Sequence, residues 1–385
     1  MATLLLGIIY LSFISLGLPD ALLGAAWPIM YPEFQVPVSY AGLISAIISV
    51  GTIISSLFSD RLTHRLGPGK VTALSVATTA LALFGFSVSH SFLQLCLWAV
   101  PYGLGAGSVD AALNNYVAVH YSSRHMSWLH CMWGLGASTG PYVMGYILTG
   151  GHPWPLGYRC IGTLQIVLTT LLFLSLPLWK TCVGKSDPSV SGAPLTLLEI
   201  VRIAGAKEVM LAFFCYCGLE QTAGLWASSY LVLQHGLSSE MAAGYASLFY
   251  VGLTAGRGLC GFLTLKWNDT QMIFIGQAVS AAGIAILLLP LGPSAALAGL
   301  ILTGVGCAPI YPSIIHSTPT HFGASRSQAL IGIQMACAYV GTCLMPPVFG
   351  FLANHISIAL YPVFLLAVLF LMTAMHLRLL QKISH

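Results

Sequence analysis

Long apolar stretches separated by short polar ones run through the whole chain. Each of twelve stretches is long enough for the roughly 20 residues that a helix needs to cross a bilayer. None alternates between apolar and polar residues over about ten positions, as the strands of a membrane barrel do. The pattern predicts an all-α integral membrane protein with twelve transmembrane helices, near residues 4–30, 39–59, 71–89, 92–119, 126–149, 159–181, 208–234, 238–262, 270–290, 293–318, 327–352 and 357–378.

Composition supports this class. Hydrophobic residues make up 57% of the 385 residues and charged residues only 6%, against about 25% charged in a soluble domain. The first apolar stretch lacks a basic n-region and a following A-x-A site, so we expect mature sequence and no cleaved signal peptide. The ten cysteines include no Cys-x-x-Cys pair, and we expect core residues with neither a disulfide nor a metal site.

The basic residues predict the orientation. If both termini are cytoplasmic, thirteen of the fourteen Lys and Arg lie inside or at an inner helix end, and only Arg159 lies outside. Cytoplasmic loops of membrane proteins carry such an excess. We therefore expect a multi-pass monomer in the cell inner (plasma) membrane with the lipid bilayer as its partner. The net charge of +4 follows from this topology and indicates no nucleic-acid partner.

The chain consists of two similar halves. We expect a six-helix bundle over 1–181, a polar cytoplasmic linker over 182–207 and a second six-helix bundle over 208–385. Glycines and prolines of the first half recur about 200 residues later: Gly103 and Gly105 as Gly304 and Gly306, and Pro141 and Gly145 as Pro346 and Gly350. Duplicated bundles of this kind enclose a central site in secondary transporters.

Three acidic side chains fall near the middle of predicted membrane helices. These are Asp20, Asp110 and Glu220, whereas the other seven acidic residues fall in loops or at the membrane interfaces. An ionised carboxylate at that depth costs about 2.5–3.5 kcal/mol on insertion scales, so it needs a polar cavity or a partner. In a cavity that opens alternately, such an acid can take up and release a proton. The alternative is a protonated or hydrogen-bonded acid that only ties helices together.

Other polar and aromatic side chains of the inner helices are candidates for substrate binding. Asn114 lies one helical turn after Asp110. Trp133 either stacks on a sugar ring or packs in the core, and Gln334 either lines a cavity or bonds a neighbouring helix. No Ser-His-Asp, H-E-x-x-H or phosphate-binding motif is present, so we expect no enzyme. With Asp20 and Glu220, the candidate binding residues are Asn114, Asn115, Trp133, Gln221, Trp226 and Gln334.

Charged residues at predicted inner helix ends suggest a cytoplasmic gate. Asp60, Arg61 and Arg65 end the second apolar stretch, and Arg257 ends the eighth as an inner-face anchor. They are either topology determinants, or a latch in which Asp60 pairs with a neighbouring helix end when the inner side is closed.

Several motifs together resemble a known family. The twelve-helix duplicated pattern is similar to the major facilitator superfamily, and within it to the fucose permease and sodium-dependent glucose transporter-like branch. The motifs are Gly17-Leu18-Pro19-Asp20, Asp110 with Asn114, Leu129-His130 with Trp133-Gly134, and Tyr216-x-Gly218-x-Glu220 with Trp226 and Tyr230. The resemblance implies that Asp20 recognises sugar hydroxyls or takes part in coupling, and that Asp110 carries the proton.

We therefore expect a secondary active transporter, a proton symporter that imports a monosaccharide or a similar polyhydroxylated solute by alternating access. The coupling ion is H⁺ or Na⁺, and no other cofactor is expected. The alternative of the same fold is a proton-antiporting exporter of drugs or metabolites. From another class, the alternative is a substrate-sensing receptor or scaffold without turnover.

Overall fold

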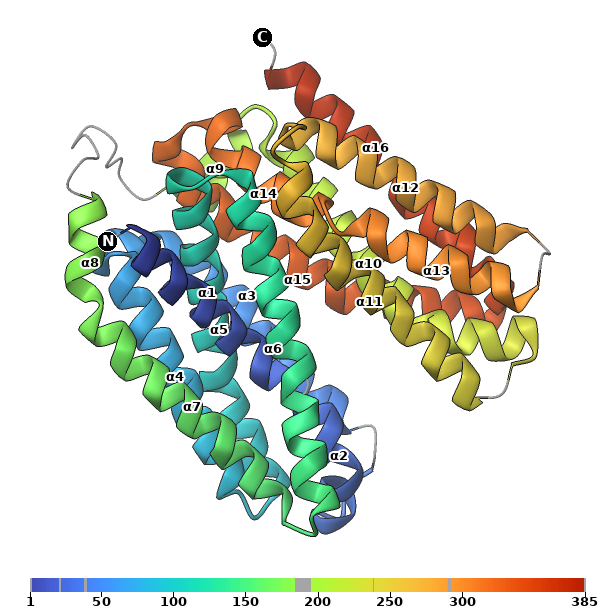
Figure 1. Ribbon diagram of the computed structural model, residues 1–385, viewed down its shortest axis with the longest axis horizontal. Helices are drawn as coiled ribbons and strands as arrows, with labels where there is room; N and C mark the ends of the chain where they lie inside the picture. Colours follow the sequence, from blue (N-terminus) through green and yellow to red (C-terminus); the bar gives the residue numbers. More distant parts are fainter. Residues whose placement is uncertain are drawn as a thin grey trace. The chain divides into compact units, whose positions relative to one another are not determined.

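The structure is a computed structural model that describes residues 2–20, 22–37, 40–183, 195–237, 239–289 and 292–383, so residues 184–194 of the predicted linker lie outside the described residues. The described residues form helices and no strand (Figure 1). The helices are α1 Ala2–Asp20, α2 Leu22–Glu33, α3 Ala41–Leu66, α4 Pro68–Ser87, α5 Phe92–His120, α6 Ser123–Thr149, α7 Trp154–Leu174, α8 Leu176–Val183, α9 Leu197–Arg202, α10 Ala206–His235, α11 Ser239–Leu263, α12 Asp269–Leu288, α13 Pro293–Cys307, α14 Ile310–Phe322, α15 Ala324–His355 and α16 Tyr361–Ile383.

Among the described residues, ten helical segments are long and apolar enough to cross a membrane. Two of these segments each contain two of the helices: α1 and α2 lie in the span Thr3–Glu33, and α13 and α14 lie in the span Pro293–Phe322, where a turn at Ala308 and Pro309 separates them. The two remaining predicted spans are α6 and α10, with 27 and 30 residues. They are long enough to cross but less apolar, because α6 carries several serines, threonines and histidines and α10 carries Lys207, Glu208, Glu220 and Gln221. The predicted all-α membrane fold is confirmed.

The described chain forms two compact units. One comprises Met1–Tyr116, Leu129–Pro194 and Ala324–Met335, and the other comprises Val117–Trp128, Leu195–Gly323 and Ala336–His385. The units follow the two sequence halves except at two short segments. The α5–α6 connection belongs with the C-terminal helices, and the first turns of α15 belong with the N-terminal helices.

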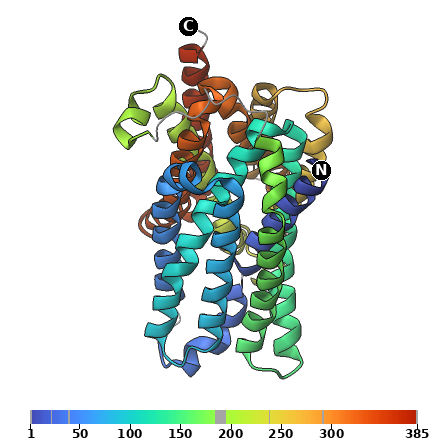
Figure 2. The same ribbon diagram turned by 90° about the vertical axis from the view of Figure 1, so that its left-hand side faces the viewer.

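The N-terminal unit has its helices side by side along their length (Figure 2, blue to green). Its core lies where α1 and α2 meet α4, α5 and α7, and it includes Leu22, Trp27 and Met30. Trp154, at the start of α7, donates its indole N–H to Glu33 Oε2 at 2.7 Å. This bond ties the end of α2 to α7 and satisfies both polar groups at the edge of the core.

The same kind of close glycine contact occurs within each unit. Gly103 on α5 lies against the carbonyl oxygen of Ile48 on α3, so closely that a Cβ would overlap it. Gly304 on α13 lies in the same way against the carbonyl oxygen of Phe249 on α11. Small residues allow membrane helices to approach this closely. The repeated contact supports the duplication inferred from the glycine spacing.

Candidate functional site

Helices α1 and α6 cross at a glycine contact that places the first polar cluster. Gly136 and Gly140, one turn apart on α6, lie against the carbonyl oxygens of Ile14 and Leu18 on α1. Gly17 on α1 lies in turn against the backbone of α6, where a Cβ would meet the Ala137 nitrogen at 2.7 Å. Because no side chain separates the helices, residues one turn away on each can bond directly.

Asp20 lies one turn beyond this crossing and binds two aromatic side chains. The indole N–H of Trp133 donates to its Oδ2 at 3.0 Å, and the hydroxyl of Tyr102 on α5 donates to its Oδ1 at 3.2 Å. Tyr102 is buried and Trp133 half-buried, but Asp20 is exposed although it lies near the middle of the first span. Since exposing a carboxylate to hydrocarbon is costly, we infer that its open side faces water.

Asp110 begins a buried polar chain in the N-terminal unit. Asn114, one turn later on α5, donates its amide N–H to Asp110 Oδ1 at 2.8 Å. The Asn114 amide oxygen accepts from His130 Nε2 on α6 at 3.1 Å. Asn114 is fully buried and His130 is 5% exposed. Asn114 thus connects Asp110 to His130 and does not reach a cavity in this structure, in contrast to its predicted role as a binding residue.

Two other candidates of this unit lie apart from the Asp20 cluster. Asn115 Oδ1 accepts from the hydroxyl of Ser327, in the first turn of α15, at 2.5 Å. Gln334, two turns further along α15, is fully buried. The side chain of Asn115 therefore bonds α15, and not Asp110, which lies five residues earlier on α5.

Glu220 lies in a buried cluster of the C-terminal unit. Tyr216, one turn earlier on α10, donates its hydroxyl to Glu220 Oε2 and to the carbonyl oxygen of Cys307, the latter at 3.0 Å. Arg257 on α11 donates to the same carboxylate oxygen at 3.1 Å. The Arg257 side chain is 4% exposed and that of Glu220 is 20% exposed. The expected inner-face position of Arg257 is wrong, because its long side chain pairs with a mid-helix carboxylate.

The other α10 candidates have separate environments. Gln221 is half-buried. Trp226 donates its indole N–H to the carbonyl oxygen of Pro346 on α15 at 3.0 Å, and its ring packs edge-on against Phe349, with 5.4 Å between ring centroids. Trp226 therefore joins α10 to the proline-containing part of α15, where the Pro346-Pro347 pair interrupts the helical hydrogen bonds.

Two of the predicted gate residues on α3 have contacts within their own helix. Asp60 is buried and lies 3.5 Å from Nε2 of His64, one turn later on the same helix. Arg61 and Arg65 are exposed, and the Arg61 guanidinium lies over the Phe58 ring at 5.7 Å from its centroid.

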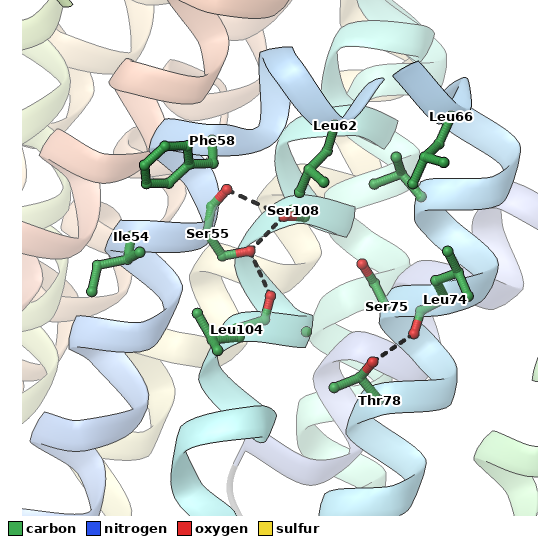
Figure 3. Close-up of a pocket in the computed structure, with 12 residues that line it drawn as sticks. Ile54, Ser55, Phe58, Leu62, Leu66, Leu74, Ser75, Thr78, Leu104 and Ser108 are labelled. Atoms are coloured by element: carbon green, nitrogen blue, oxygen red, sulfur yellow. Dashed lines mark hydrogen bonds between the residues drawn. The ribbon is translucent and has the colours of Figure 1, made fainter. Parts of the chain in front are cut away.

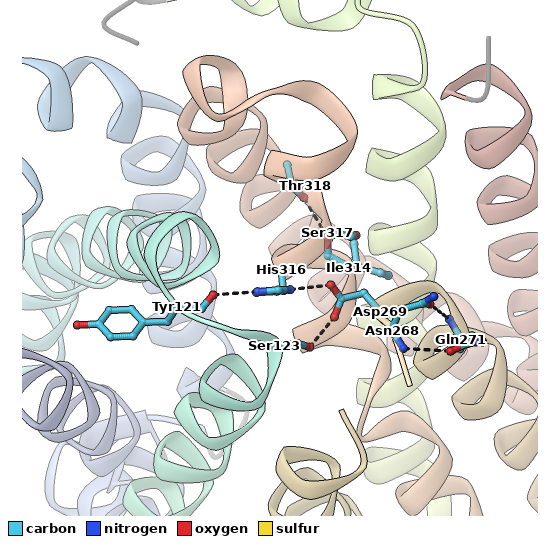
Figure 4. A network of polar contacts seen from close by, with 9 residues as sticks. All are labelled: Tyr121, Ser123, Asn268, Asp269, Gln271, Ile314, His316, Ser317 and Thr318. Atoms are coloured by element: carbon cyan, nitrogen blue, oxygen red, sulfur yellow. Dashed lines mark hydrogen bonds and ion pairs between the residues drawn. The ribbon is translucent and has the colours of Figure 1, made fainter. Parts of the chain in front are cut away.

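A polar network that the sequence analysis missed lies in the C-terminal unit (Figure 4). Asp269, in the first turn of α12, accepts from the Ser123 hydroxyl at 2.5 Å and lies 2.6 Å from Nδ1 of His316 on α14. Nε2 of His316 lies 3.0 Å from the carbonyl oxygen of Tyr121. Both imidazole nitrogens face acceptors, an arrangement that suits a protonated histidine beside an ionised aspartate. Residues of the α5–α6 connection are thereby bound to α12 and α14.

Comparisons with known proteins agree with this fold. The chain is 22% identical to the cis,cis-muconate transport protein of Acinetobacter baylyi, over 85% of this chain and 82% of the relative. It is also 22% identical to the glucose/mannose transporter GlcP of Bacillus subtilis, over 79% of this chain and 77% of the relative. Its fold is similar to the crystal structure of the transporter FucP in the outward conformation, with a TM-score of 0.78, 18% identity, and coverage of 96% of this chain and 98% of that one.

The family match extends over most of the chain. The sequence model of the Major Facilitator Superfamily matches residues 9–294 and 209–383. The chain therefore belongs to the Major Facilitator Superfamily.

Proposed function

We propose that this transporter takes up a monosaccharide, or a similar polyhydroxylated solute, together with a proton. The observation that carries the proposal is the Asp20 cluster. A carboxylate with an open side, held by Trp133 and Tyr102 at the last described residue of α1, suits recognition of sugar hydroxyls. Two neighbouring hydroxyls can donate to one carboxylate, and an indole face offers an apolar platform for a sugar ring.

Asp110 is the proposed site of proton coupling. Its bond to Asn114, which in turn bonds His130, holds the carboxylate in a fixed position. Asp110 is half-buried, so closing the cavity around its ionised form removes a charge from water at a cost. A bound proton neutralises that charge and permits the change between outward-open and inward-open states, which couples transport of the solute to the proton.

Glu220 suits coupling less well than Asp110. Its negative charge is already compensated by Arg257, and Tyr216 binds the same oxygen. A proton on Glu220 would leave the buried Arg257 without its counter-charge, which is a large cost. We therefore propose that the Glu220–Arg257 pair stabilises the C-terminal unit and that Asp110 titrates during transport.

The proposed orientation has both termini in the cytoplasm of a cell whose plasma membrane holds the protein. It is supported by the distribution of Lys and Arg: in this orientation twelve of the fourteen would lie inside or at an inner helix end, Arg257 is buried against Glu220, and only Arg159 would lie outside. In this orientation the network of Asp269 and His316 lies at the cytoplasmic end, because α12 begins there, and its bonds to Ser123 and Tyr121 would have to break when that end opens.

Proteoliposomes test the function. We expect an inward proton gradient to drive accumulation of at least one monosaccharide from a panel, with no requirement for sodium. Asp110→Asn should abolish that accumulation while exchange of labelled for unlabelled sugar continues. Glu199→Gln, which removes an exposed carboxylate on α9, serves as the control and should behave as wild type. Accumulation of an organic acid such as muconate but of no sugar would contradict the substrate class. A sodium gradient as the only driver would contradict proton coupling.

A further inference from the structure

A groove opens on the N-terminal unit (Figure 3), and its lining includes neither Asp20 nor Asp110. It has a volume of about 270 Å³ and lies between the inner halves of α3, α4 and α5. At one edge of the groove α5 approaches α4 closely, because a Cβ at Gly105 would lie only 2.9 Å from the Ser75 carbonyl oxygen. Its lining residues are Ile54, Ser55, Phe58, Leu62, Leu66, Val71, Leu74, Ser75, Thr78, Leu104, Gly105 and Ser108.

The walls of the groove are apolar and open to the membrane. Phe58 is 49% exposed, Leu74 46% and Leu104 41%. All three belong to helices that are long and apolar enough to cross a membrane, so exposed apolar surface of this kind suits contact with hydrocarbon. On this basis the groove is treated as open toward the lipid.

The floor of the groove is polar but its hydrogen bonds are formed internally. The hydroxyls of Ser55 and Ser108 lie 2.5 Å apart, and Ser55 lies 2.5 Å from the Leu104 carbonyl oxygen. The Thr78 hydroxyl donates to the Leu74 carbonyl oxygen at 2.8 Å. With the hydroxyls of Ser55, Ser108 and Thr78 bonded in this way, the groove offers a polar solute mainly the Ser75 hydroxyl, whereas an alkyl chain suits the apolar walls.

Three cationic side chains lie at the end of the same groove where α3 ends and α4 begins. Arg61 and Arg65 lie one turn apart on α3, interleaved with the lining residues Phe58, Leu62 and Leu66, and the Arg61 guanidinium lies over the Phe58 ring. Lys70 precedes Leu74 by one turn on α4, on the same stripe of that helix. All three are exposed, and none forms an ion pair with a carboxylate of the described residues.

We propose that the groove binds one acyl chain of an anionic phospholipid whose headgroup phosphate is held by Arg61, Arg65 and Lys70. A membrane lipid is the molecule that brings an apolar chain and a negative headgroup to the same place at this depth. Basic pockets between transmembrane helices bind anionic headgroups in this way. The inference requires the membrane fold but not the proposed substrate or proton coupling.

Native mass spectrometry of the full-length protein tests the headgroup part. The protein is released from nanodiscs that contain equal amounts of phosphatidylglycerol and phosphatidylethanolamine. We expect one tightly retained phosphatidylglycerol and at least tenfold less phosphatidylethanolamine. In the triple variant Arg61→Gln, Arg65→Gln, Lys70→Gln, the affinity for phosphatidylglycerol should fall about 100-fold, because each cation near an anionic headgroup contributes about fivefold, or about 1 kcal/mol.

A matched control tests whether the loss of any three exposed cations lowers phosphatidylglycerol binding. The triple variant Arg202→Gln, Arg326→Gln, Arg378→Gln removes three other exposed cations and should retain phosphatidylglycerol as wild type does. Equal loss in both triple variants would overturn the site, as would equal retention of the two lipids by wild type.

A second variant tests the groove itself and leaves the cations in place. Thr78→Phe adds an aromatic ring inside the groove, which Thr78 lines. We expect it to lower phosphatidylglycerol retention at least fivefold while the midpoint of thermal unfolding changes by less than about 3 °C, since a substitution facing lipid avoids the core. Wild-type retention in this variant would show that no chain occupies the groove and would overturn the proposal.

Discussion

The Glu220–Arg257 pair gives a sharp test of the energetics inside the C-terminal unit. Its two charged groups lie 3.1 Å apart, with the Arg257 side chain 4% exposed. At about 4 Å between charge centres and an effective dielectric constant of about 20, their attraction is about 4 kcal/mol. Removing one partner of a buried pair costs about 3–5 kcal/mol, because the other charge is left uncompensated. Removing both charges together costs much less.

The test is a double-mutant cycle in which thermal unfolding of detergent-solubilised protein is measured. For a unit of this size, about 1 kcal/mol shifts the midpoint by about 2–4 °C. Arg257→Gln should therefore lower the midpoint by about 6–20 °C. The double variant Glu220→Gln, Arg257→Gln should recover most of that loss and unfold within about 3 °C of wild type.

Two exposed charges provide the control for this cycle. Glu199 and Arg202 lie on the short helix α9, where both are exposed. Glu199→Gln and Arg202→Gln should leave the midpoint unchanged, because exposed charges contribute little to stability. The assignment of Glu220 to a structural pair is refuted if the decreases in unfolding midpoint caused by Glu220→Gln and by Arg257→Gln simply add in the double variant. In that case the two side chains do not compensate each other.

Three further predictions follow from other contacts. Gly140→Val should lower the unfolding midpoint, with a cost of about 1–3 kcal/mol from overpacking against Leu18, and Gly145→Val, with open space around its Cα, is the control. Trp133→Phe, which keeps a ring but removes the donor to Asp20, should weaken sugar binding about tenfold in a thermal-shift titration, and unchanged affinity would remove Trp133 from the site. Asp269→Asn should raise hydrogen exchange several-fold in Val117–Trp128 by weakening the bond to His316, and unchanged exchange would show that this network does not hold the segment.

The helical framework was predictable because hydropathy acts along the chain. Spans such as Phe92–His120 and Asp269–Leu288 match the predicted ranges within a few residues. The glycine contacts were also predictable. Small residues such as Gly103 occur in membrane helices where the backbones of two helices approach each other closely. Both features depend on local composition, which a single sequence displays.

The partners of the acidic residues were only partly predictable. The bond between Asp110 and Asn114 follows from their spacing of one helical turn. The complete burial of Asn114 beneath His130 depends on how α5 packs against α6, and nothing in either helix alone indicates it. For the same reason, Tyr102 was not identified as a partner of Asp20, from which it is separated by 82 residues.

Two charged contacts were not predicted. One is formed by a long side chain and the other by segments that lie far apart in the sequence. Arg257 lies near the end of α11, which suggested a position at the membrane surface, but its side chain extends back to Glu220. The pairing of Asp269 with His316 and Ser123 joins segments that share no motif or spacing. Asp269 alone carried a local signal, as an acidic residue in the first turn of a capped helix.

The most direct test of the central claim is the movement of protons during sugar entry. Wild-type protein is reconstituted into weakly buffered vesicles without any imposed gradient, and the external pH is recorded when a transported monosaccharide is added. We predict that the external solution becomes more alkaline in proportion to the sugar that enters, and that Asp110→Asn exchanges sugar without this change. Sugar entry through the wild-type protein with no change of external pH would contradict proton symport.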